Sequence, residues 1–140
     1  MFDTAHIHPM LVHFPIALTL LGFLLELIAI VRKQPSRCGE IILYFATFSA
    51  ILAASAGALF TPDFTEAKLA AAKNIHSTFA GITVTLLCIA SAFYIGTHIW
   101  KVYAVLFRKI GFILYAASAL AVAATGFLGG VLVYNDLLKM

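Results

Sequence analysis

Hydrophobic residues fill four long stretches of the chain, and short polar segments separate them. We place these stretches at about 10–31, 40–60, 75–100 and 110–134. Each reaches the length of about 20 residues that a helix needs to cross the hydrocarbon core of a bilayer. The pattern predicts an all-α fold, an integral membrane bundle of four transmembrane helices that forms a single domain over residues 1–140. The segment 64–74 also has helical character and either lies at the membrane surface or extends the third span.

The composition agrees with this interpretation. Hydrophobic residues make up 63% of the chain and charged residues 11%, with a mean hydropathy of +1.03. A soluble globular protein has about 45–50% apolar and about 25% charged residues, so a water-soluble monomer is excluded. The net charge of +3 is small and scattered, which argues against a nucleic-acid partner. We expect the first apolar run to be retained rather than cleaved, because no basic segment precedes it.

The basic residues predict how the helices are oriented. Loops on the cytoplasmic side of a membrane carry more Lys and Arg than those on the other side. The segments after spans one and three hold six basic residues, whereas the middle loop and the two termini together hold three. We therefore expect both termini outside the cytoplasm.

The five histidines gather mostly at the outer end. His6 and His8 precede span one, His13 lies just inside it, and His76 begins span three. Only His98 falls at the inner end. Ionisable side chains within a membrane are candidates for functional residues. Spans one and three run in the same direction, so His13 and His76 are expected at a similar depth.

Two imidazoles at one depth favour a bound haem or metal ion. We predict that His13 and His76 are axial ligands of a b-type haem, with His8 beside them as a further ligand or a propionate partner. His76 shares a helical face with Thr83. A non-haem copper or zinc site built from His6, His8, His13 and His76 is the chief alternative. For each histidine, a hydrated or hydrogen-bonded position without any ligand stays open.

Small residues occur at the same end of the predicted bundle. Close helix packing and a flat slot for a porphyrin both need such residues, and Gly126 with Gly130 forms a GxxxG pair. We include them as cofactor-binding candidates: Gly57, Gly81, Gly126, Gly129 and Gly130. Tyr134 closes span four on the same side and either completes the rim of the site or belongs to the interfacial aromatic belt.

Two polar residues fall toward the inner end. His98 is expected to be an interfacial anchor beside Trp100. Glu26 is expected to reach the headgroups, to pair with Arg32 or Lys33, or to serve a proton path. The sequence shows no phosphate loop, HExxH motif or paired-cysteine zinc motif, so hydrolase chemistry is not expected.

The two ends of the chain carry recognisable motifs. The opening runs His8-Pro9-Met10-Leu11-Val12-His13-Phe14-Pro15, and the close contains Gly129-Gly130-Val131-Leu132-Val133-Tyr134. Together with Gly57 and His76, they resemble the bacterial family of small four-helix membrane proteins catalogued as domain of unknown function 2231. The resemblance implies a multi-pass protein of the bacterial inner membrane. Some relatives are joined to Rieske-type iron–sulfur domains, which implies a connection to electron transfer.

The residues and the resemblance together predict a haem-binding membrane protein that transfers electrons at the outer face of the membrane. Quinone or a periplasmic redox protein is the expected partner, with a role in a membrane oxidoreductase left open. Two alternatives remain: the copper or zinc protein, and a cofactor-free structural or assembly protein in which the GxxxG face mediates homo-oligomerisation.

Overall fold

The computed structural model describes residues 10–34, 37–60, 65 and 67–137, with the side chains of 135–137 excepted. Four helices follow one another: α2 (His13–Val31), α3 (Cys38–Phe60), α4 (Ala67–Ile99) and α5 (Ala104–Leu137). All four are long and apolar enough to cross a membrane. The predicted all-α transmembrane bundle is thus confirmed, and the described ranges contain no strand.

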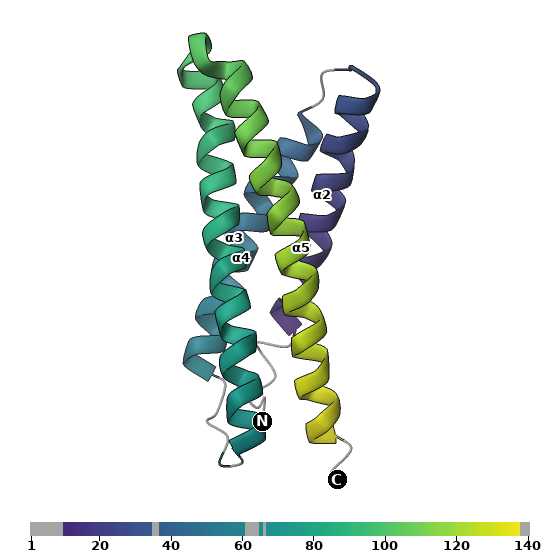
Figure 1. The fold of residues 1–140 in the computed structure, drawn as a ribbon, viewed down its shortest axis with the longest axis vertical. Coiled ribbons are helices and arrows are strands. Elements are labelled where there is room, and N and C mark those ends of the chain that lie inside the picture. Colours follow the sequence, from purple (N-terminus) through teal and green to yellow (C-terminus); the bar gives the residue numbers. More distant parts are fainter. Residues whose placement is uncertain (1–9, 35–36, 61–64, 66, 138–140) are drawn as a thin grey trace.

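The helices pack as two antiparallel hairpins (Figure 1). We call α2 with α3 the first hairpin and α4 with α5 the second hairpin. Packing is most extensive within each hairpin, and α3 against α4 and α2 against α5 join the two. Helices α2 and α4 therefore occupy diagonal positions in the bundle. The end of α2, the start of α3 and the α4–α5 turn lie at one end of the bundle, here called the turn end, and the start of α2 and the end of α5 lie toward the other, the terminal end.

The second hairpin is longer than the sequence predicts. Helix α4 begins at Ala67, so the helical segment before His76 extends the third span. Helix α5 begins at Ala104, because a single 3-10 turn over Lys101–Tyr103 suffices to reverse the chain. Its 34 residues correspond to about 51 Å, against about 30 Å for the hydrocarbon core. The basic residues near its start, which suggested a loop, are accommodated on a helix because long cationic side chains extend toward water.

Small and polar residues and a few large side chains face the bundle interior, whereas most large apolar residues face outward. The buried positions of α2 are Pro15, Thr19, Gly22, Glu26 and Ala29, at the spacing of one helical face. The core cluster comprises Leu43, Ala50, Leu87, Ala90, Tyr94 and Tyr115. Phe45, Phe48 and Leu120 are among many exposed apolar side chains. Such an inside-out distribution is typical of a protein whose outer surface contacts lipid.

Hydrogen bonds link the first hairpin to the second. Thr47 of α3 lies 2.8 Å from the Ser91 hydroxyl of α4 and also donates to the backbone of its own helix. Near the turn end, α2 and α3 approach so closely that a Cβ on Gly39 would meet the backbone nitrogen of Glu26 at 2.8 Å. Packing of small residues and polar contacts between helices are the interactions that join helices in lipid, where the hydrophobic effect is weak.

Candidate functional site

His76 is held against α5 by a hydrogen bond to the main chain. Its Nδ1 lies 3.1 Å from the carbonyl oxygen of Thr125. A carbonyl oxygen can only accept, so Nδ1 carries the proton and donates it. The neutral ring then has its lone pair on Nε2. This is the arrangement found in metal-ligating histidines, whose second nitrogen usually donates to a carbonyl or carboxylate.

The helical face that holds His76 is the one expected from the sequence. Thr83, two turns further along α4, lies 3.1 Å from the Thr125 hydroxyl, so both residues contact the same position of α5. A Cβ added to Gly129 would meet His76 Cε1 at 3.1 Å and Nδ1 at 3.4 Å. Glycine at position 129 thus lets the imidazole lie directly on the backbone of α5.

His13 lies at about the same depth as His76. A Cβ added to Gly126 would meet Ile16 Cδ1 at 3.1 Å, which sets the register between α5 and α2. These helices run antiparallel. His13 lies three residues from Ile16 toward the terminal end, and Gly129 lies three residues from Gly126 in the same direction. Each step corresponds to about 4.5 Å along the helix axis. His13 is exposed at the start of α2, and α5 contacts both α2 and α4. Joint ligation by His13 and His76 stays a prediction.

The other candidate positions differ in their surroundings. Gly126 and Gly129 are covered by protein side chains, whereas a Cβ on Gly81 or Gly130 would find nothing within 4 Å. Gly57 is half-buried in α3, and Tyr134 is 68% exposed. His6 and His8 lie outside the described residues. Within the described ranges, no group of three or more His, Cys, Asp and Glu side chains forms a metal cluster.

Glu26 forms an ion pair that the sequence does not predict. Its Oε1 accepts a hydrogen bond of 2.8 Å from Arg108 Nη2, and its side chain is fully buried. The predicted pairing with Arg32 or Lys33 is wrong. Glu26 lies on the same buried face as Gly22 and therefore points into the bundle, while Arg32 and Lys33 are exposed beyond it. Arg108 reaches it from the second hairpin.

His98 also has an acidic partner in the first hairpin. Its Nε2 is hydrogen-bonded to Oε1 of Glu40, which also accepts a 2.8 Å hydrogen bond from the Tyr44 hydroxyl. The Glu40 side chain is only 5% exposed, whereas that of His98 is 41% exposed. Beyond the interfacial position expected from the sequence, His98 therefore joins α4 to α3. The position of Glu40 near the start of the second predicted span did not indicate that it pairs with His98.

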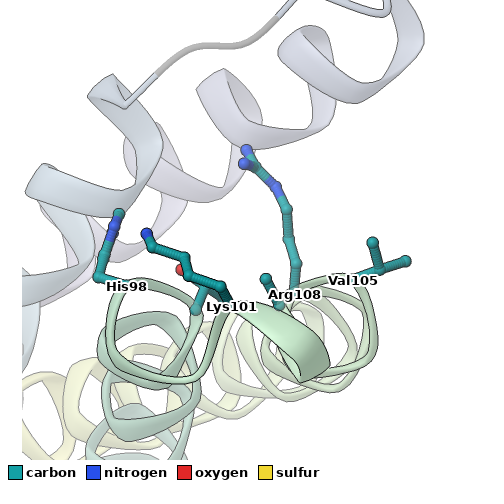
Figure 2. A pocket seen from close by; sticks show the side chains of 6 residues that line it. His98, Lys101, Val105 and Arg108 are labelled. Carbon is teal, nitrogen blue, oxygen red and sulfur yellow. The ribbon is translucent and has the colours of Figure 1, made fainter.

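A groove opens at the turn end beside these two pairs (Figure 2). It has a volume of about 300 Å³ and is lined by Thr97, His98, Lys101, Ala104, Val105 and Arg108. The side chains of His98, Lys101 and Arg108 point toward the first hairpin, and Val105 points away. The groove thus brings together three nitrogen-bearing side chains from α4, the connecting turn and α5.

The comparisons with known proteins bear on the family and the fold class. A family described as "Predicted membrane protein (DUF2231)" matches residues 4–140, nearly the whole chain. Neither the curated proteins nor the solved structures contain a match. The match agrees with the helical, multi-pass architecture and with the two end motifs. The chain belongs to the DUF2231 family of predicted membrane proteins.

Proposed function

We propose that this membrane protein binds a b-type haem near its terminal end and transfers electrons there. His76 and His13 are the residues that would hold the haem iron. The observation that carries the proposal is the hydrogen bond from His76 Nδ1 to the Thr125 carbonyl oxygen. It fixes the tautomer in which Nε2 is available to a metal, and it fixes the orientation of the ring.

The residues around His76 fit this role. Because Gly129 has no side chain, the imidazole can lie against α5 with its orientation restricted by the backbone. The register between α5 and α2 puts His13 at a similar depth. The neighbouring Gly130 leaves open space on α5. Thr83 is hydrogen-bonded to the side-chain hydroxyl of Thr125, whose main-chain carbonyl oxygen accepts the hydrogen bond from His76.

A bound haem would supply a reversible one-electron carrier. If His13 and His76 both held the iron, no position would be left for oxygen, which would favour electron transfer over oxygen binding. The contribution of the chain would be to orient the His76 ring through its Nδ1–H and to keep the carrier at the terminal end of the bundle. Quinone or a soluble redox protein is the partner class that this role implies, within a membrane oxidoreductase.

An absorption spectrum tests the proposal directly. Protein purified in detergent from haem-replete cells should show a Soret band and, on reduction, a sharp alpha band. His76→Ala should lose these bands while keeping its helical content. Ser77→Ala, an exposed neighbour, and His98→Gln, an imidazole at the turn end, should keep them. Gly129→Ala should shift the bands, because the added Cβ displaces the ring.

Other outcomes would contradict the proposed haem binding. A protein that stays colourless after reconstitution with haem would overturn the proposal. Metal analysis of such a protein would reveal copper or zinc if the non-haem alternative holds. A colourless, metal-free protein whose oligomeric state is lost in Gly130→Leu would instead indicate a structural or assembly role.

A further inference from the structure

The turn-end groove is built around side chains that buried carboxylates hold in place. Arg108 is 43% exposed, yet one of its nitrogens is tied to Glu26, which is fully buried. His98 is tied in the same way to Glu40. Both carboxylates belong to the first hairpin, so each basic side chain is drawn toward the first hairpin and across the groove. Long side chains normally lose entropy on binding a ligand, and this cost is reduced when they are already ordered.

Hydrogen-bond donors that these ion pairs do not use remain on the basic side chains of the groove. A guanidinium group has five N–H donors, and the hydrogen bond from Arg108 to Glu26 uses one of them. Lys101, at the start of the connecting turn, is exposed and makes no salt bridge with a carboxylate in the described ranges. The groove therefore offers a positive charge without a partner and a planar group suited to phosphate oxygens.

The position of the groove matches that of a lipid headgroup. It lies at the end of two membrane-spanning helices, beside Trp100 and Tyr103, which are each 55% exposed. Aromatic residues of this type mark the level of the headgroups. Part of its wall is apolar: Ala104 and Val105 line it, and Val105, which points away from the first hairpin, is 72% exposed.

We propose that the turn-end groove binds the phosphate headgroup of an anionic phospholipid. Lys101 and Arg108 contact the phosphate oxygens, and the acyl chains extend along the exposed apolar surface that begins at Val105. Basic pockets between transmembrane helices are known to bind such headgroups. This site is at the opposite end of the bundle from His76, and it does not depend on the proposed haem.

Lipid-dependent thermal stabilisation tests the proposal. The full chain, delipidated in a mild detergent, is titrated with phosphatidylglycerol, with phosphatidylcholine of the same acyl chains, and with inorganic phosphate. Phosphatidylglycerol should raise the unfolding temperature most. Native mass spectrometry of the same samples should show one or two retained phosphatidylglycerol molecules.

Two lysines provide a matched pair of variants. Lys101→Gln should bind phosphatidylglycerol about fivefold more weakly, as expected for one basic residue near a membrane surface. Lys109→Gln removes the same charge from an exposed position of α5 outside the groove and should bind like the unmodified chain. Equal weakening in both variants, or equal stabilisation by the two lipids, would overturn the proposal. Equal stabilisation by inorganic phosphate would replace the lipid with a soluble anion and equally overturn it.

Discussion

Removal of either partner of the Glu26–Arg108 ion pair should destabilise the bundle by very different amounts. The two side chains are 2.8 Å apart, but that of Glu26 is fully buried and that of Arg108 is 43% exposed. Arg108→Met leaves the carboxylate of Glu26 in the bundle interior without its cation. The buried hydroxyls of Tyr94 and Tyr115 carry no positive charge and so do not replace the guanidinium. Loss of one partner of a buried pair costs about 3–5 kcal/mol.

Glu26→Gln should be much milder. The amide oxygen of glutamine can still accept a hydrogen bond from Arg108, and the half-exposed guanidinium can turn toward water or headgroups. We expect a loss of about 1 kcal/mol, as for a pair with a solvent-accessible member. The double variant Glu26→Gln with Arg108→Met should be more stable than Arg108→Met alone, because no charge is then left buried.

Equilibrium unfolding in detergent, followed by far-UV circular dichroism, measures these differences. The experiment uses no added lipid, so that a ligand of the turn-end groove does not contribute. Lys109→Met, an exposed neighbour on α5, should change the free energy of unfolding by less than about 0.5 kcal/mol. Equal losses in the two single variants, or additive losses in the double variant, would refute the assigned burial of the pair.

Two further predictions concern packing and hydrogen bonding between the helices. Gly39→Ala should lower the thermal unfolding temperature, because its Cβ would meet the backbone nitrogen of Glu26 at 2.8 Å. Gly81→Ala has open space for the added Cβ and should raise the free energy of unfolding by about 0.5–1 kcal/mol. A Gly39→Ala variant more stable than Gly81→Ala would contradict the close approach of α2 and α3. Thr47→Val should cost about 1–3 kcal/mol in the free energy of unfolding because the buried Ser91 hydroxyl loses its partner, and Ser91→Ala in the same background should recover part of that loss.

The sequence predicts the transmembrane architecture well because lipid imposes a simple rule on composition. Long apolar runs must form helices, and the four runs appear as α2 to α5 with shifts of a few residues at most of their ends. The largest differences are at the start of α4, which begins at Ala67 against a predicted 75, and at the start of α5, which begins at Ala104 against a predicted 110. Lys101, Arg108 and Lys109 suggested a loop before α5, and composition does not reveal that the helix already carries Arg108 and Lys109 near its start.

The site was predictable only in part. The face of α4 shared by His76 and Thr83 was expected from helical periodicity, and both residues contact α5 on that face. That α5 is the neighbour could not be predicted, because periodicity gives a face and not the identity of its partner. The Glu26–Arg108 pair could not be predicted for the same reason, because the two residues are far apart in sequence and belong to different spans.

The division into two hairpins has a consequence for how the protein is made. The first hairpin is synthesised before the second, and it carries both Glu26 and Glu40, whose basic partners Arg108 and His98 are 82 and 58 residues downstream. A nascent chain that has inserted only α2 and α3 therefore contains two carboxylates whose hydrogen-bond partners have not yet been synthesised. The second hairpin brings Arg108 to Glu26 and His98 to Glu40. Docking of the second hairpin thus satisfies acidic residues that the first hairpin alone leaves without these partners.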